Sequence, residues 1–146
     1  MAKNQPTRRR PPSAVPWVIG ALAVVAVVYV LVIVKGPAPR SHPEPRSDAA
    51  SMGESLMPAS FFAANPRIQR TYQLAREIPG TLDGLYCYCD CSQHAGHRSL
   101  LTCFQSEHGA GCDICLGEAD TAHEMLAQKK SLAEIRAQID LAFGRK

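Results

Sequence analysis

The longest uninterrupted hydrophobic run of this 146-residue chain lies near its N-terminus. Residues 17–34 carry no charged side chain, and as an α-helix they would span roughly 27 Å, about the thickness of the hydrocarbon core of a bilayer. Trp17 stands at one end, where an aromatic ring favours the membrane interface. The run is longer than the hydrophobic part of a usual signal peptide, and no small-x-small cleavage pattern follows it. We therefore expect a retained transmembrane anchor rather than a cleaved signal.

Hydrophobic residues in the second half of the chain recur at helical spacing. A first helix is expected to begin at Asn65, an N-cap residue followed by proline, and to end before Pro79. Two further helices are expected over 99–108 and 112–128, and a capping box beginning at Ser131 opens a last one. The hydrophobic stripe of that helix consists of Leu132, Ile135, Ile139 and Phe143. Because the chain contains no strong strand pattern, it predicts a small, mainly α-helical domain.

These patterns divide the chain into parts with different roles. Residues 1–15 are expected to form a basic tail, 16–35 the transmembrane helix, 36–60 a proline-rich, semi-extended tether, and 61–146 a cysteine-rich helical domain. The domain has few aromatic residues, and domains of this size often need a metal or disulfides for stability. Its cysteines could therefore staple the fold in addition to any other role.

The charge distribution predicts an orientation in the membrane. The net charge of +3 averages a strongly basic N-terminal third and a mildly acidic remainder. Lys3 and Arg8–Arg10 crowd the N-terminal side of the hydrophobic run, so the N-terminus should be cytoplasmic and the cysteine domain extracytoplasmic. The expected location is the cell's inner or plasma membrane, with a single pass. Disulfides can persist outside it. A nucleic-acid partner is not expected, because the folded part lacks a basic stripe.

All six cysteines fall between positions 87 and 115, which indicates one shared site. Cys87, Cys89 and Cys91 occupy alternate positions, and alternate residues of an extended segment point to the same side. Neighbours in a C-x-C pair are poor disulfide partners for each other, because disulfides need particular Cα separations. The spacing favours a metal site or a redox relay.

The second cysteine pair is a C-x-x-C motif formed by Cys112 and Cys115. On a helix, positions i and i+3 share a face, so both sulfurs could reach a common metal. A helix N-terminus also stabilises a thiolate and should lower the pKa of Cys112. The motif suits a metal site and a redox dithiol equally well. Haem attachment is excluded, because Leu116 stands where the required histidine would be.

Soft-ligand preferences favour Cu(I) among the metals. Zinc sites usually use two C-x-x-C pairs, and the chain has only one, so zinc is less favoured. The spacings also differ from common iron–sulfur frameworks. Thiolates at C-x-C spacing suit Cu(I), with histidines as ligands or as hydrogen-bond donors to them. The candidate metal-binding residues are Cys87, Cys89, Cys91, Cys103, Cys112 and Cys115, with His94, His97 and His108 as auxiliary donors.

Two other functions remain open at this stage. The protein could be a thiol oxidoreductase in which Cys112 and Cys115, or a C-x-C pair, exchange a disulfide. It could also be a structural module that is stapled by disulfides and docks a membrane partner. Cys103 lies in an apolar stretch and could simply be a buried small residue. Hydrolytic chemistry is poorly supported, since no Ser/His/Asp motif or phosphate-cradling glycine loop is present, and no small-molecule substrate is evident.

Over about residues 85–143, the chain resembles the small bacterial proteins named for a C-Y-C-x-C motif, also described as PCYCGC. The matching segments are Cys87-Tyr88-Cys89-x-Cys91, His94-Ala95-Gly96-His97, Ser99-Leu100-Leu101-x-Cys103-Phe104, His108, and Gly111-Cys112-Asp113-Ile114-Cys115. The chain departs from the PCYCGC form at Tyr86, which replaces a proline, and at Asp90, which replaces a glycine. Many members resemble lipoproteins, whereas this chain has a hydrophobic anchor. The resemblance implies metal binding, and the selenoproteins described among its members imply redox-active sulfur.

The leading expectation is a membrane-anchored, extracytoplasmic protein that binds and carries Cu(I). Its expected partner is a membrane protein that receives copper or exchanges electrons. An enzymatic activity is not favoured; if one exists, it should be thiol oxidoreduction.

Overall fold

The computed structural model describes residues 24, 25, 27 and 40–144. The chain divides into two compact units, residues 1–36 and 37–146, and the second contains the cysteines. The expected basic tail and almost all of the expected anchor over 16–35 lie outside the described residues. Among the residues that are described, no helix is both long and apolar enough to cross a membrane.

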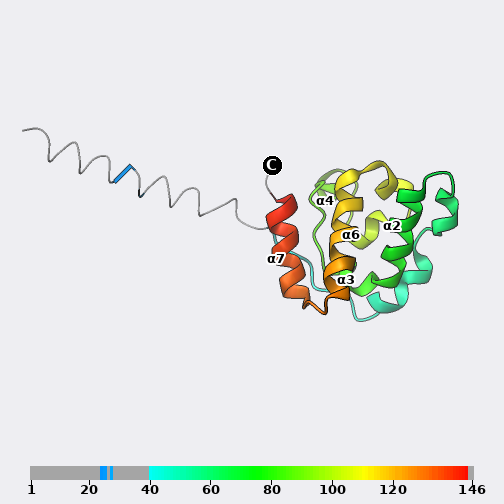
Figure 1. The fold of residues 1–146 in the computed structure, drawn as a ribbon, viewed down its shortest axis with the longest axis horizontal. Coiled ribbons are helices and arrows are strands. Elements are labelled where there is room, and N and C mark those ends of the chain that lie inside the picture. Colours follow the sequence, from blue (N-terminus) through cyan, green and yellow to red (C-terminus); the bar gives the residue numbers. More distant parts are fainter. Residues whose placement is uncertain (1–23, 26, 28–39, 145–146) are drawn as a thin grey trace, which may run out of the picture. The chain divides into compact units, whose positions relative to one another are not determined.

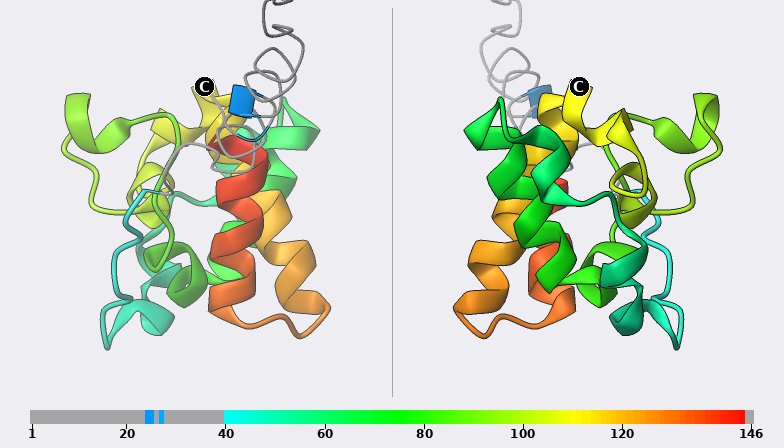
Figure 2. Two further views of the ribbon diagram at one scale, coloured as in Figure 1. Left: turned by 90° about the vertical axis from the view of Figure 1, so that its left-hand side faces the viewer. Right: turned by 90° about the vertical axis from the view of Figure 1, so that its right-hand side faces the viewer.

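The second unit is built from helices, and its described part contains no strand (Figure 1). The predicted mainly α-helical class is therefore confirmed. In chain order the elements are η1 (Ala49–Ser55), η2 (Ala59–Phe62), α2 (Pro66–Glu77), α3 (Pro79–Asp83), α4 (Cys91–His94), α5 (Leu100–Cys103), η3 (Glu107–Gly111), α6 (Asp113–Ala127) and α7 (Leu132–Phe143). Helix α6 packs against both α2 and α7, and Figure 2 shows α6 and α7 side by side, joined by a short loop.

The helix ends follow the local signals of the sequence. Asn65 caps α2 by accepting a hydrogen bond from the Ile68 backbone N–H, and Pro66 occupies the first turn. Helix α2 ends at Glu77, as predicted, but a new short helix begins at once at Pro79, because proline suits the first helical position. The predicted capping box at Ser131 is present at the start of α7.

The helix expected over 99–108 is divided into two shorter elements. Helix α5 covers only Leu100–Cys103, and the 3-10 helix η3 follows from Glu107 to Gly111. Ser106 interrupts the run because its backbone is extended, with φ −139° and ψ −174°, and its side chain caps η3 by accepting from the His108 N–H. Serine favours such caps over a helix interior. The division places Cys103 and His108 on different elements.

The segment expected as a tether packs against the domain from residue 40 onward. Leu56 is only 2 % exposed and lies in the core, and the Met57 N–H donates to the Phe104 carbonyl at 2.9 Å. Arg46 binds the buried Asp83 through both its backbone N–H and its guanidinium. The folded domain therefore includes residues 40–60, rather than beginning at 61. The tether expected over 36–60 is, from residue 40 onward, a segment packed on the domain.

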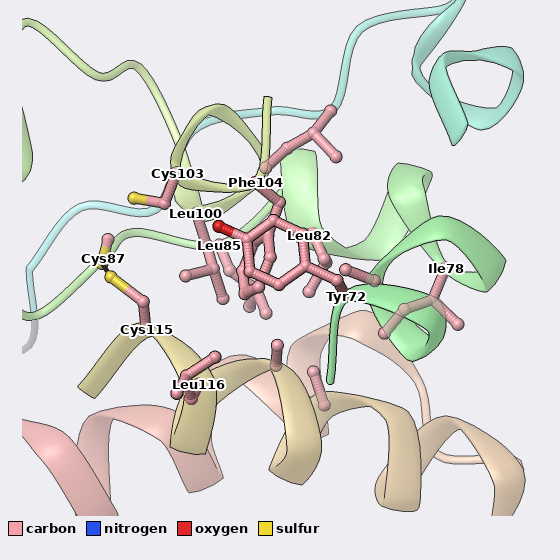
Figure 3. Close-up of a cluster of buried hydrophobic side chains, with 14 of the residues drawn as sticks. Tyr72, Ile78, Leu82, Leu85, Cys87, Leu100, Cys103, Phe104, Cys115 and Leu116 are labelled. Carbon is pink, nitrogen blue, oxygen red and sulfur yellow. Dashed lines mark hydrogen bonds between the residues drawn. The ribbon is translucent and has the colours of Figure 1, made fainter. Parts of the chain in front are cut away.

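The core is one hydrophobic cluster with the cysteines at its edge. Its largest fully buried side chains include Tyr72 and Phe104, whose rings are 5.0 Å apart. Figure 3 shows the sulfurs of Cys87, Cys103 and Cys115 gathered at one side of this cluster. Burial of the surrounding apolar surface thus positions the sulfur atoms.

Candidate metal centre

The loop that carries the first cysteines is held by contacts at both of its tyrosines. The Tyr86 backbone N–H donates to His42 Nδ1 at 2.9 Å, which fixes this loop to the N-terminal segment. The Tyr88 N–H donates to Glu118 Oε1 on α6 at 2.8 Å, and the Tyr88 hydroxyl donates to Asp140 on α7. The backbone on either side of Cys87 is therefore anchored independently of any metal.

Cys87, Cys89 and Cys91 converge through a turn and not along an extended strand. The Asp90 N–H donates to the Cys87 carbonyl at 3.1 Å, which closes a turn. Asp90 itself is left-handed, with φ 59°, and leads directly into α4, which begins at Cys91. This is the position of the glycine in the PCYCGC form, and aspartate is one of the residues that tolerate the left-handed region. The extended geometry expected for this segment was wrong, although the sulfurs do point together.

Three sulfurs form a compact triangle. Cys87 Sγ lies 3.2 Å from Cys89 Sγ and 3.4 Å from Cys115 Sγ, and Cys89 and Cys115 are 3.5 Å apart. These separations far exceed the roughly 2.05 Å of a disulfide, and all six cysteines are free thiols. Together with Cys91 and Cys103, these make a group of five cysteines whose sulfurs all lie within 4.8 Å of one another.

A second group adds two histidines to two of the same sulfurs. Cys91 Sγ is 3.0 Å from His108 Nε2, and Cys103 Sγ is 3.2 Å from His97 Nδ1. The four ligand atoms of this group also lie within 4.8 Å of one another. The two rings meet edge to face with centroids 4.5 Å apart. Cys91 and Cys103 therefore belong to both groups.

Two of the predicted metal-binding residues lie outside these groups. Cys112 is the N-cap of α6, with an extended backbone at φ −131° and ψ 107°. Because it precedes the first helical residue, it does not share a helical face with Cys115 as the i, i+3 spacing predicted. His94 is exposed at the end of α4, and its ring centroid lies 6.4 Å from that of His108.

Hydrogen bonds between the sulfurs, together with burial, raise the pKa values of most of the clustered cysteines and keep them in the thiol form. Burial raises the pKa of Cys91 to about 11, helped by a hydrogen bond with Cys89. The pKa of Cys115 is raised by its hydrogen bond with Cys103 and by burial. For Cys103, a hydrogen bond with Cys115 lowers the pKa, but another with Cys87 and burial raise it further. The pKa of Cys87 is also raised. Its hydrogen bond with Cys103 lowers the pKa, but a hydrogen bond with Cys115, burial and the Glu118 carboxylate raise it by more.

Cys89 and His97 differ from these buried thiols. Cys89 is half-buried, and this burial alone would raise its pKa. Hydrogen bonds with Cys91, Cys87 and Cys115 have the larger combined effect, so the pKa of Cys89 is lowered. The pKa of His97 is lowered by burial and by the nearby His108 and His94 rings. A neutral imidazole is the form that binds metals. Among the clustered cysteines, Cys89 therefore ionises most easily, and His97 favours the neutral form that a metal ligand needs.

Glu118 is the residue of this region that sequence reasoning missed. It is fully buried on α6, three residues after Cys115, so that the two share a helical face. Its charge opposes ionisation of Cys87. The i, i+3 spacing from a candidate ligand was the signal that could have identified it. The arrangement as a whole can hold a metal ion in a buried, sulfur-rich setting.

Comparisons with known proteins place the chain in a family without assigning it a function. No curated protein and no solved structure matches the chain. A family model described as "protein of unknown function with PCYCGC motif" matches residues 42–145. The match includes both ligand groups and begins inside the packed segment that precedes η1, which agrees with the extent of the folded domain. It confirms the resemblance seen in the sequence, and the chain belongs to the PCYCGC-motif family.

Proposed function

We propose that the protein binds Cu(I) through its clustered thiols and carries it at the outer face of the cell membrane. The observation that carries this proposal is the convergence of five cysteine sulfurs, from the loop before α4, α4, α5 and α6, to within 4.8 Å of one another. Thiolates are soft ligands, and Cu(I) is the soft ion among the common biological metals. Hard cations such as Mg²⁺ and Ca²⁺ would need oxygen ligands instead.

The number of sulfurs favours copper over zinc. A structural zinc ion takes four ligands at tetrahedral corners, whereas this site crowds more sulfurs than that into one place. Three of them already form a triangle with edges of 3.2 to 3.5 Å, an arrangement suited to an ion that accepts low coordination numbers. Burial of Cys91, Cys103 and Cys115 would protect bound Cu(I) from water and oxygen.

The proposed location rests on the sequence alone. The uncharged run over 17–34, preceded by Lys3 and Arg8–Arg10, supports a single-pass anchor with a cytoplasmic N-terminus. The domain would then face the extracytoplasmic side, and its partner would be a membrane protein that accepts copper from it.

A second candidate function is thiol–disulfide exchange, favoured by Cys89. This half-buried thiol has a lowered pKa, and Cys115 Sγ lies 3.5 Å away. The Cys89 thiolate would attack a disulfide of a partner protein, forming a mixed disulfide and releasing one partner thiolate. The Cys115 thiol would then attack Cys89 Sγ as it passes its proton to the departing second partner thiolate, so that the partner gains two electrons and a Cys89–Cys115 disulfide forms. Cys115 is a better resolving thiol than Cys87, because C-x-C neighbours form strained disulfides.

The decisive experiment titrates the reduced, full-length chain in detergent with Cu(I) in the presence of a competing chelator. We expect tight copper binding, and we expect the double variant C87S/C115S to retain less copper than the wild type against the chelator. The C112S variant is the matched control, because Cys112 lies outside both ligand groups, and it should retain copper as the wild type does. Equal copper retention by C87S/C115S would contradict the proposal.

The same variants separate the two functions. Under thiol exchange, C115S alone should trap a partner on Cys89 as a mixed disulfide that is visible on a non-reducing gel. Under the copper proposal, C115S should trap none.

A further inference from the structure

We infer that the centre has two metal positions of unlike chemistry, joined by the sulfurs of Cys91 and Cys103 as bridges. One position would be made of sulfur alone, with Cys87, Cys89 and Cys115 as its own ligands. The other would be a mixed position, completed by His97 and His108. This inference rests on the proposed function, because it concerns how the same ligands are shared out.

The sulfur position is close to the size that a metal requires. Metal–sulfur bonds of about 2.3 Å place neighbouring sulfurs about 3.8 Å apart in a tetrahedron and about 4.0 Å apart in a planar triangle. The edges of the Cys87, Cys89 and Cys115 triangle are 3.2 to 3.5 Å. The sulfurs therefore need to separate by about 0.3 to 0.8 Å to hold an ion between them.

The ligand atoms of the mixed position are also close to the separations that a bound metal requires. With metal–nitrogen bonds of about 2.0 Å and metal–sulfur bonds of about 2.3 Å, a tetrahedral site places nitrogen and sulfur about 3.5 Å apart. The observed contacts are 3.0 Å between Cys91 Sγ and His108 Nε2, and 3.2 Å between Cys103 Sγ and His97 Nδ1. Each histidine directs a specific ring nitrogen at a sulfur, so both rings are already oriented. Imidazole and thiolate together suit copper and zinc.

Cys91 and Cys103 can bridge the two positions because they belong to both ligand groups. Cys91 and Cys103 lie within 4.8 Å of every ligand atom of the sulfur group and of every ligand atom of the mixed group. A thiolate sulfur has several lone pairs and can bind two metals at once. The histidines belong to the mixed group alone, and the Cys87, Cys89 and Cys115 sulfurs belong to the sulfur group alone. A single ion could not use all of these ligands, whereas two ions sharing Cys91 and Cys103 can.

The test counts Cu(I) ions on the reduced, full-length chain in detergent by native mass spectrometry under anaerobic conditions. The wild type should bind two ions, and H97A/H108A should bind one, a twofold loss. His94 provides the matched control, since it ends α4 three residues before His97 but lies outside the group. The H94A variant should still bind two ions. The converse variant C87S/C89S should also bind one, at the mixed position.

X-ray absorption of the copper-loaded wild type provides a readout that does not depend on whether a variant folds. We expect both sulfur and nitrogen neighbours, together with scattering from a second copper. Copper surrounded only by sulfur, or without a copper neighbour, would overturn the two-position arrangement.

The outcomes distinguish this inference from the proposed function. Two ions on the wild type and one on H97A/H108A support it. A single ion on the wild type, more than two, or an unchanged pair on H97A/H108A overturns the two-position arrangement and leaves copper binding intact. No copper on the wild type overturns both.

Discussion

Replacing Asp83 by asparagine should destabilise the domain more than any change to a surface ion pair. The Asp83 side chain is fully buried at the end of α3. Its carboxylate accepts hydrogen bonds from the Arg46 backbone and guanidinium, from Arg98 at 2.8 Å and from the Ser99 hydroxyl at 3.0 Å. It thereby ties two segments to the core: the packed N-terminal segment and the loop that leads from His97 into α5.

The structure sets the size of the effect. Burial would raise the pKa of Asp83, but the hydrogen bonds and charge of Arg46, with the Ser99 hydroxyl, lower it to about 2. A depression from 3.8 to about 2 corresponds to about 2 kcal/mol of stability at neutral pH. Breaking a buried ion pair costs about 3–5 kcal/mol when one partner is removed. Arg46 and Arg98 are 38 % and 41 % exposed and can be partly rehydrated, so we expect the lower end, about 3 kcal/mol.

The assay is urea unfolding of the metal-free protein, followed by far-UV circular dichroism. The D113N variant is the control, because Asp113 pairs with Arg67 at the same 2.8 Å but both side chains are largely exposed. It should cost at most about 1 kcal/mol. Because the folded pKa of Asp83 lies below its unfolded value, its contribution is present above about pH 4 and is lost as the pH falls toward 2. A cost of D83N below about 1 kcal/mol, or one that stays constant from pH 7 to pH 2, would refute this reasoning.

Three further predictions follow from the packing and from the thiols. The metal-free fold should lose stability as the pH rises above about 8.5, where unfolded thiols ionise, because buried thiols such as Cys91 have raised pKa values and stay neutral. Urea unfolding at pH 7 and pH 10 under reducing conditions would show this loss, and unchanged stability would contradict it. I139A should cost about 2–5 kcal/mol because Ile139 is fully buried, while L141A on the exposed face of the same helix should cost less than about 0.5 kcal/mol; thermal unfolding of both compares them. G109A should lower both stability, by about 1–3 kcal/mol, and copper affinity, because its Cβ would lie 2.9 Å from a backbone oxygen of α5. G111A, which meets nothing within 4 Å, should change neither, and equal effects of the two in copper titrations would contradict this placement.

Local features of the fold could be predicted from the sequence because their causes are local. The cap at Asn65 and the capping box at Ser131 each depend on residues within one helical turn, and both are present. The stripe of α7 likewise points inward, with Ile135 and Ile139 fully buried. Helix α6 differs from its predicted bounds by a single residue at each end.

Features that depend on distant partners were not predictable in the same way. The proline-rich composition of 36–60 suggested a free tether, but composition does not show that Arg46 meets a buried carboxylate on α3. The turn at Asp90 depends on a positive φ, which a glycine at this position would have indicated but an aspartate does not. Cys112 has the expected spacing from Cys115, yet the helix begins one residue too late for the two to share a face.

The way the ligand segments are held bears on the proposal that the protein carries a metal rather than storing it. The loop around Cys87 is fixed by Glu118 and Asp140 through Tyr88, and α5 is fixed by the burial of Leu100 and by the Asp83 network. None of these contacts uses a sulfur atom. In a zinc finger, by contrast, the free energy of metal binding is the free energy of folding, so removing the metal unfolds the chain. Here the ligands are preorganised by hydrophobic burial and hydrogen bonds. If the proposed Cu(I) site is filled, we therefore expect the fold to persist when the metal leaves, which the proposed transfer to a partner would require.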